Sequence, residues 1–308
     1  MTIFPVIFPL VLLTTLGYLS ARLKLVSQQT ITEVSKVTFN FLIPLYLFHH
    51  IATADLSSNL SLDVFTNFYG VVLSIYLTTS FLFFALNKNS QINNTSASVF
   101  SLAGCYSNTI IVGLPVLVSI MDDSVAAIVF LIISFHSAVL FSLTSFFTQL
   151  GGNKKFSFSS LAKSTLFNPL LIGIFSGLIF NLLDINFTDW ISGSFELLTK
   201  PALTLALLLL GTSLNQFQIK TSLPLIALAS FIKLVALPLA VFLAATYVFE
   251  LSHTTRLILV VLTACPTGVN AYLVAAQQNS GQAVLAGTVV FSTIASAITI
   301  PTWLIFLT

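Results

Sequence analysis

Charged residues are scarce in this chain. Only 6% of its 308 residues are Asp, Glu, Lys or Arg, whereas a soluble domain usually has about 25%. Hydrophobic residues make up 56%. A soluble protein of this length cannot cover its surface with so few charges, so most of that surface must face lipid. The composition predicts an all-α polytopic membrane protein and excludes a soluble globular domain.

The sequence also lacks the motifs of enzymes and metal sites. Its two cysteines, Cys105 and Cys265, lie in apolar surroundings with no Cys/His cluster around them, so neither a disulfide framework nor a metal site is expected. There is no G-x-x-x-x-G-K phosphate loop, no H-E-x-x-H zinc motif and no pair of membrane aspartates. We therefore expect no catalytic residue, no cofactor and no nucleic-acid partner.

Ten apolar segments are long enough to cross a bilayer, whose hydrocarbon core of about 30 Å needs about 20 helical residues. They cover residues 3–22, 35–54, 64–87, 97–120, 124–149, 165–184, 195–215, 222–249, 256–278 and 283–306. The first lacks the basic start of a signal peptide. The polar linker 151–164 divides the chain into two five-segment halves, 1–150 and 165–308.

Charges separate into two sets when loops are assigned alternately to the two sides. The loops after segments 1, 3, 5 and 7 carry eight basic residues, namely Arg22, Lys24, Lys36, Lys88, Lys154, Lys155, Lys163 and Lys220. The opposite side carries two basic residues, Lys200 and Arg256, and the acidic residues Asp55, Asp63, Asp122, Asp123, Asp184, Asp189, Glu196 and Glu250. Because basic loops stay in the cytoplasm, both termini are predicted on the non-cytoplasmic side. Only Glu33 departs from the pattern.

Two halves with five segments each enter the membrane in opposite orientations, which is the arrangement of an inverted repeat. LAGCYSN at Leu102–Asn108 aligns with LTACPTG at Leu262–Gly268, and the two cysteines coincide in that alignment. The match is short, and chance similarity is the alternative. More informative is that each half has a polar interruption in its fourth segment.

The interruptions place helix-breaking and polar residues where lipid favours an unbroken helix. They contain Asn108, Gly113 and Pro115 in the fourth segment and Pro266, Gly268 and Asn270 in the ninth. Unpaired backbone groups are tolerated at membrane depth only where they line a cavity or are buried in protein. A break also creates helix N-termini whose N–H groups favour a carboxylate. The alternative is that these residues only kink and pack helices.

The sequence resembles a bacterial member of the auxin efflux carrier family. The resemblance rests on GYLSARL from Gly17, FLIPLYLFHHIA from Phe41, YSNTIIVGLPVL from Tyr106, ALTLALLLLGTSL from Ala202 and CPTGVNAYLVAAQQN from Cys265. These motifs occur in the family's order across nearly the whole chain. The sequence lacks the long hydrophilic central loop of the plant carriers, and Ala271 stands where their ninth helix has a second proline.

The resemblance implies ten transmembrane helices in two inverted five-helix repeats, the fold of bile-acid symporters and sodium/proton antiporters. Spans 1, 2, 6 and 7 would form a scaffold, often homodimeric, and spans 3–5 and 8–10 a transport unit. The broken fourth and ninth helices would cross at mid-membrane and bind an organic anion. The family's binding positions correspond to Asn108, Gly113, Pro115, Pro266, Gly268, Val269 and Asn270. Malate, malonate and similar carboxylates are then better candidates than auxin, in the inner membrane of a bacterium.

Several other polar residues lie within the apolar segments. Lys233 falls near the middle of the eighth segment, where a lysine is costly, and is expected to support the anion site rather than bind the anion. The His49–His50 pair and His136 are candidates for proton coupling, although simple packing is the favoured reading. Thr109 and Thr267 join the candidate binding residues because their hydroxyls could also hold sodium. No carboxylate lies near mid-membrane, so coupling to protons or sodium is left open.

These observations together predict a secondary transporter of small organic anions that works by elevator-type alternating access. An intramembrane enzyme is disfavoured because no catalytic motif is present. A channel or a ligand-sensing receptor with the same fold stays as the alternative. The transported anion, the direction of transport and the oligomeric state are not determined by the residues.

Overall fold

The structure is a computed structural model that is helical throughout the residues it describes, which are 4–54, 62–86, 94–121, 126–150, 168–217, 223–278 and 280–308. The predicted linker 151–164 lies outside these residues. So do eight of the charged residues used to predict the topology: Asp55, Lys88, Asp122, Asp123, Lys154, Lys155, Lys163 and Lys220.

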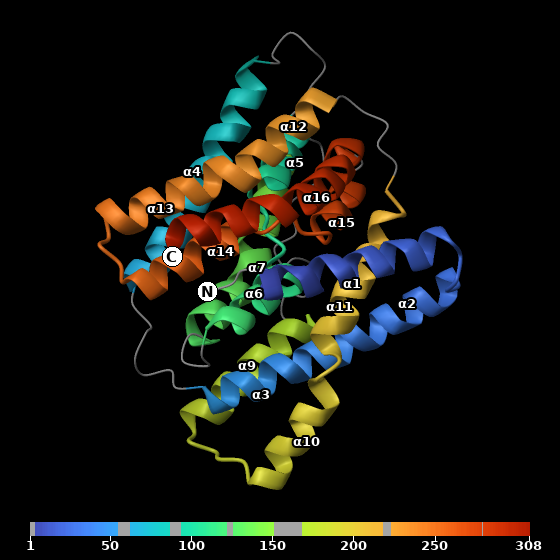
Figure 1. Cartoon of the computed structure of the whole chain (residues 1–308). Coiled ribbons are helices and arrows are strands. Elements are labelled where there is room, and N and C mark those ends of the chain that lie inside the picture. Colours follow the sequence, from blue (N-terminus) through green and yellow to red (C-terminus); the bar gives the residue numbers. More distant parts are fainter. Residues whose placement is uncertain are drawn as a thin grey trace.

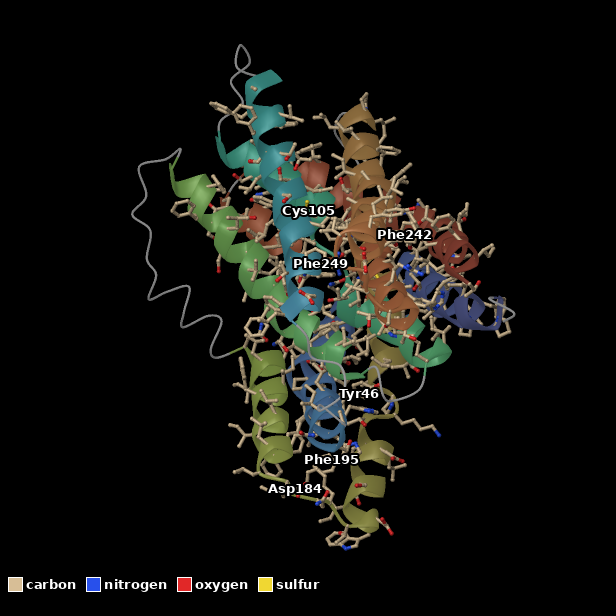
Figure 2. All side chains as sticks on the ribbon, turned by 90° about the vertical axis from the view of Figure 1, so that its left-hand side faces the viewer. Tyr46, Cys105, Asp184, Phe195, Phe242 and Phe249 are labelled. Atoms are coloured by element: carbon tan, nitrogen blue, oxygen red, sulfur yellow. The ribbon has the colours of Figure 1, made fainter. Side chains whose placement is uncertain are left out.

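One group of helices occupies the lower part of Figure 1, with α1 and α2 at its right. It consists of α1 (Phe4–Arg22), α2 (Gln28–Val37), η1 (Thr38–Leu42), α3 (Ile43–Thr53), α9 (Pro169–Leu182), α10 (Asp189–Thr199) and α11 (Ala202–Leu214). Within it α1 packs along α11, and α3 packs along α9 and α10. In the view from the side, Tyr46 and Phe195 lie within this group (Figure 2).

A second group occupies the upper part of Figure 1. It consists of α4 (Leu62–Leu86), α5 (Asn94–Cys105), η2 (Thr109–Gly113), α6 (Leu114–Ile120), α7 (Ala126–Leu150), α12 (Leu223–Phe231), η4 (Ile232–Ala236), α13 (Leu237–Tyr247), α14 (His253–Ala264), α15 (Ala271–Gln278) and α16 (Gln282–Leu307). Here α4 packs on α5 and α13, while α16 packs on α12 and α14.

Glycines bring the paired helices of the first group into backbone contact. A Cβ added to Gly17 of α1 would lie 2.0 Å from the carbonyl oxygen of Leu208, and one added to Gly211 of α11 would lie 2.0 Å from that of Thr14. The α3–α9 pair is similar, since a Cβ on Gly173 would lie 2.3 Å from the oxygen of Pro44. Small residues allow this approach in lipid, where packing rather than hydrophobic burial drives helix association.

The helices fall within the ten predicted apolar segments or extend a few residues beyond them, and two begin more than five residues early. The second segment becomes helical at Gln28 rather than residue 35, because Ser27 caps it by accepting a hydrogen bond from the Thr30 N–H. The seventh becomes helical at Asp189 rather than residue 195. The residues added to α2 are mostly polar and those added to α10 mix polar residues with Trp190 and Ile191, so hydropathy alone did not include them.

Within the described residues, five helices are long and apolar enough to span a membrane. They are Leu62–Ala85, Ile128–Thr148, Asp189–Leu214, Leu223–Tyr247 and Gln282–Leu307. Four shorter apolar helices, including Thr109–Ile120 and His253–Ala264, belong to other predicted segments. The chain is therefore a polytopic helical membrane protein, while the number of ten crossings stays a prediction.

Candidate functional site

The two interrupted segments meet at their breaks. The fourth segment leaves helical geometry at Tyr106–Asn108, and the ninth does so between α14 and α15. An antiparallel bridge pairs Ser107 with Thr267. In this bridge the Asn108 N–H donates to the Pro266 carbonyl at 2.8 Å, and the Gly268 N–H donates to the Tyr106 carbonyl at 3.1 Å. Each break thus supplies the hydrogen-bond partners that the other has lost.

Neighbouring helices satisfy the remaining N–H groups of the bridge. The Ser107 N–H donates to Nε2 of His136 on α7 at 2.9 Å. The Thr267 N–H donates to the Ser292 hydroxyl on α16 at 3.0 Å. The Thr267 hydroxyl in turn donates to the Ala103 carbonyl at 2.7 Å. Buried backbone donors need partners. These side chains supply them, and so they stabilise the non-helical backbone of both breaks in this conformation.

Gly268 is required by the closeness of the two segments. A Cβ at this position would lie 2.4 Å from Cε1 of Tyr106, which is shorter than any van der Waals contact. The Tyr106 ring is itself fixed, because it stacks on His136 with centroids 5.1 Å apart and its hydroxyl pairs with Ser137 at 2.8 Å. A larger residue at 268 would therefore have to push the two breaks apart.

A small pocket opens beside the bridge. It is lined by Asn108, Thr109, Ile110 and Ile111 from one break, by Gly268, Val269 and Asn270 from the other, and by Phe39 and Leu170 from the first group of helices, together with Tyr106 and Ser107. Its volume is about 20 Å³, which is enough for about one water molecule.

The starts of two helices face this pocket. Thr109 begins η2, which continues into α6, and the residues from Gly268 to Asn270 precede α15. The first N–H groups of a helix have no partner within it and carry partial positive charge. Such ends are suited to an anion, and here two of them approach the same space.

Asn108 and Ser107 contribute buried polar atoms that have no partner among the described residues. These atoms are the Asn108 side-chain Nδ2 and the Ser107 Oγ. Both residues are almost fully buried, with Asn108 only 5% exposed. A buried donor left without a partner costs about 1–3 kcal/mol. Both residues line the small pocket.

Lys233, in η4, lies against the C-terminal end of α14. It is fully buried, and its Nζ donates a hydrogen bond to the Thr263 carbonyl. That carbonyl is in the last turn of α14, where helix carbonyls lack partners and carry partial negative charge. A cation at this end is stabilising, so Lys233 supports the break in the ninth segment. It does not line the pocket.

His136 and His50 have different surroundings. Because Nε2 of His136 accepts from the Ser107 N–H, that nitrogen carries no proton. His136 is therefore a positioning residue for the fourth-segment break. His50 does not line the pocket; its ring lies 4.2 Å from that of Tyr46 and 6.3 Å from that of Phe130.

The structure places the nine predicted binding residues in two sets. Five of them line the pocket: Asn108, Thr109, Gly268, Val269 and Asn270. The other four, Gly113, Pro115, Pro266 and Thr267, do not line it. Pro266 and Thr267 build the bridge through their backbone and hydroxyl groups.

Gly113 and Pro115 lie in helix rather than in the break, contrary to the sequence-based location of the interruption. Gly113 allows close packing on α14, since a Cβ there would lie 3.0 Å from Sγ of Cys265. Pro115 lies inside the continuous helix formed by η2 and α6, where the π-helical turn before it accommodates the proline ring and its missing N–H. The break itself begins earlier, at Tyr106.

Sequence reasoning missed Ser107, Tyr106 and Ser292. Ser107 and Tyr106 lie beside Asn108 in the same interrupted stretch, so their proximity could have indicated them. Ser292 lies in the middle of α16 among small and apolar residues, and no local signal marks it. Only the packing of α16 against the ninth-segment break reveals its bond to Thr267.

Comparison with known proteins gives one family. The sequence model of a family described as "Membrane transport protein" matches the chain twice, over residues 2–157 and over residues 152–304. No curated protein matches the chain significantly. The two matches cover nearly the whole chain, one in each half, and the family consists of transporters rather than enzymes. The chain therefore belongs to the membrane transport protein family, the auxin efflux carrier family whose motifs its interrupted segments resemble.

Proposed function

We propose that this membrane transporter carries small organic anions and binds them in the pocket where the two interrupted segments meet. The observation that supports this most is the buried, unpartnered Nδ2 of Asn108, which lines the same pocket as two helix N-termini. Donors and partial positive charge without any carboxylate in the lining favour a carboxylate ligand. Four lining residues, Asn108, Gly268, Val269 and Asn270, were also expected from the family resemblance.

The proposal includes ten crossings in two inverted five-helix repeats, 1–150 and 165–308, whose broken fourth and ninth helices cross at mid-membrane. It is supported by the separate family match in each half and by the antiparallel bridge between the breaks. Both termini would lie on the non-cytoplasmic side of a bacterial inner membrane, as the charge distribution predicts. A homodimer is part of the same family-based proposal.

An elevator-type movement accounts for the size of the pocket. A space of about 20 Å³ cannot hold a dicarboxylate, so this conformation has to open before an anion binds. The pocket is bounded by both groups of helices, since Phe39 and Leu170 face the two breaks across it. We propose that the group containing the breaks is the transport unit and moves against a scaffold that contains α1, α3, α9 and α11. This movement would enlarge the pocket on alternate sides.

The test is an electrical measurement on purified protein in liposomes adsorbed on a solid-supported membrane. Malate, malonate, succinate, lactate and an aromatic acid are added at two pH values, with and without sodium. A saturable current for one class of acid is expected. Asn270→Ala should reduce it at least tenfold, which is about 1.4 kcal/mol, because a pocket-lining amide is lost. Asn186→Ala, at an exposed loop asparagine, is the matched control.

The pH and sodium arms identify the coupling ion, because a current that requires sodium or follows the proton gradient reports the ion directly. Equal currents in Asn270→Ala and Asn186→Ala would contradict the proposed site. If no acid gives a current, calorimetric titration with the same acids and counterflow of a radiolabelled acid separate the remaining cases. Counterflow indicates electroneutral transport, whereas binding without counterflow indicates a receptor and overturns the transporter proposal.

A further inference from the structure

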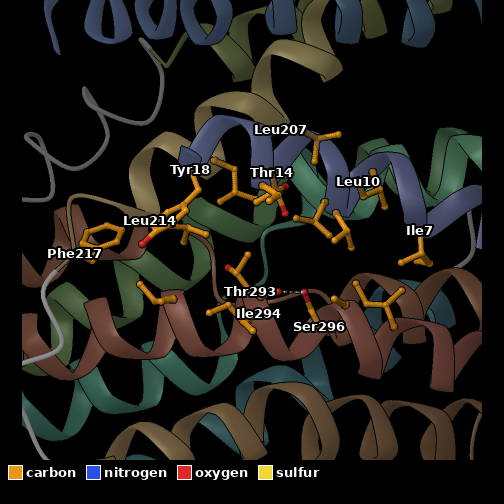
Figure 3. Close-up of a pocket in the computed structure, with 17 residues that line it drawn as sticks. Ile7, Leu10, Thr14, Tyr18, Leu207, Leu214, Phe217, Thr293, Ile294 and Ser296 are labelled. Carbon is orange, nitrogen blue, oxygen red and sulfur yellow. Dashed lines mark hydrogen bonds between the residues drawn. The ribbon is translucent and has the colours of Figure 1, made fainter. Parts of the chain in front are cut away.

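A second and much larger cavity lies between the two groups of helices, and η2 contributes lining residues to it as well as to the small pocket. Its volume is about 420 Å³, within the range of about 300–1,000 Å³ typical of ligand sites. One face of α1 from Ile7 to Tyr18, one face of α11 and one face of α16 from Val290 to Ile300 form its walls (Figure 3). Val112 of η2 also lines it.

The residues that line this larger cavity favour an apolar ligand. Among the described residues that line the cavity, none is charged and none is a histidine. The polar atoms are mainly hydroxyls, and on α16 these are already satisfied within the helix. Thr293 Oγ1 donates to the Val289 carbonyl at 2.7 Å, and Ser296 Oγ donates to the Thr293 carbonyl at 2.7 Å, so neither needs water or a polar ligand.

The cavity is continuous with the surface that faces the bilayer. Ile294, which lines it, is 67% exposed, and Val11 on the opposite wall is 40% exposed. Both are apolar side chains on helices that belong to a membrane protein, so the rim contacts lipid. From Ile7 to Tyr18 the wall is about 16 Å long at 1.5 Å per residue, which is about half of a 30 Å hydrocarbon core. This is the depth that the acyl chains of one leaflet occupy.

We propose that this cavity is a binding site for an acyl chain of a membrane phospholipid. The chain enters between α1 and α16 and fills the space, so that the apolar walls keep the dispersion contacts that an empty cavity would lose. A free fatty acid fits less well, because no cationic side chain among the described lining residues could pair with its carboxylate. The inference depends on the membrane location of the chain and not on the nature of the transported substrate.

The experiment uses the whole protein in liposomes that contain a phosphatidylcholine with a diazirine in its acyl chain. After illumination, labelled peptides are mapped by mass spectrometry. Labelling is expected at Leu10 and Thr14, which line the cavity and are only partly exposed, as well as at Leu12, which is on the outer surface of the same helix. Ala297→Phe, which fills the cavity, should reduce labelling of Leu10 and Thr14 at least fivefold and leave that of Leu12 unchanged. Ile298→Phe adds the same ring at a position that is 73% exposed and should leave the labelling unchanged.

Two results would overturn the proposal. One is equal labelling of Leu10 and Thr14 in Ala297→Phe and Ile298→Phe. The other comes from Ala297→Cys, which a charged maleimide would modify rapidly if the cavity contained water rather than hydrocarbon. Cys105 and Cys265 are both fully buried and provide a silent background. The wild-type labelling pattern and the cysteine measurement decide the question even if Ala297→Phe does not fold.

Discussion

Asn108 combines two properties that oppose each other in a folded protein. It is nearly fully buried, yet its Nδ2 has no partner among the described residues. Its main chain is fully used, because its N–H donates to Pro266 and its carbonyl accepts from Val112 and Gly113. The backbone therefore needs residue 108 in place, whereas its unpartnered buried amide costs about 1–3 kcal/mol. In the proposed function the bound anion removes this cost. The main chain of Asn108 thus contributes to the stability of the protein, whereas its side-chain amide is available to contribute to the affinity for the proposed anion.

Replacing Asn108 with leucine, which has a similar size, should separate the two effects. The unpartnered donor is removed, so the free energy of unfolding in detergent should be unchanged or higher by about 1 kcal/mol. Thermal unfolding measures this change. Transport in liposomes should fall at least tenfold, because a donor to the anion is lost. A large loss of thermal stability would instead show that the amide has a structural partner in the folded protein.

Lys233 should affect stability in the opposite way. Lys233→Met keeps the length of the side chain but leaves the Thr263 carbonyl without its donor, so we expect a loss of about 1–3 kcal/mol in the free energy of unfolding. Lys200→Met, at an exposed lysine, is the control. Thermal unfolding followed by tryptophan fluorescence measures both. If Lys233→Arg is as damaging as Lys233→Met, packing rather than charge explains the effect.

At the scale of helices, three π-helical turns have the same origin. Each of η1, η2 and η4 is followed within two residues by a proline: Pro44, Pro115 and Pro238. The N–H of the residue before each proline bonds five residues back, as Leu237 does to the carbonyl of Ile232. Proline has no N–H and clashes with the carbonyl one turn back, so the turn widens. The η4 turn contains Lys233 and so positions it toward α14.

The α1–α11 contact gives a prediction at this scale. Gly211→Ala places a methyl group 2.0 Å from the Thr14 carbonyl oxygen, so the helices must separate, and overpacking of this kind typically costs about 1–3 kcal/mol. Gly70→Ala on α4 is the matched control, because nothing lies within 4 Å of its added Cβ. Thermal unfolding of the two variants should differ by that amount. Equal melting curves would mean that α1 and α11 are not held in this close contact.

At the scale of the whole molecule, the two groups of helices meet around both cavities. The small pocket lies among Phe39, Leu170 and the two breaks, and the larger one lies between α1, α11 and α16. Contacts within each group, such as α1 with α11 and α4 with α5, are extensive, whereas α1 touches α16 only sparsely. This arrangement is suited to movement of one group against the other, because few contacts between the groups have to break.

The predicted orientation of the chain can be tested with cysteines placed in two loops. Gln29→Cys, at an exposed position near the start of α2, should react with an impermeant maleimide only from the cytoplasmic side. Asn186→Cys, before α10, should react only from the opposite side. Intact cells and inverted membrane vesicles provide the two sides. Reaction of both cysteines from the same side would contradict the alternating assignment of the loops.

The sequence alone determined the class of the molecule, because the need to cover surface with charge is a property of composition and does not depend on the fold. It also determined which two stretches interrupt the helices, since proline, glycine and asparagine act on the backbone locally. Hydropathy was less accurate at the ends of the helices, where the local sequence is less apolar. It missed the first turns of α2 and α10. The helix-breaking residues of the fourth segment predicted an interruption that included Asn108, Gly113 and Pro115, whereas in the structure only the stretch Tyr106–Asn108 leaves helical geometry.

Tertiary structure decided what the interrupted residues do. Asn108 and Pro266 are far apart in the chain, and only the meeting of the two breaks pairs them and gives Thr267, His136 and Ser292 their backbone partners. Burial likewise made Asn108 an unpartnered donor, which no residue pattern specifies. The larger cavity has walls from α1, α11 and α16, and its existence depends on how two groups of helices pack. These properties depend on contacts between distant segments, so they are not present in any local part of the sequence.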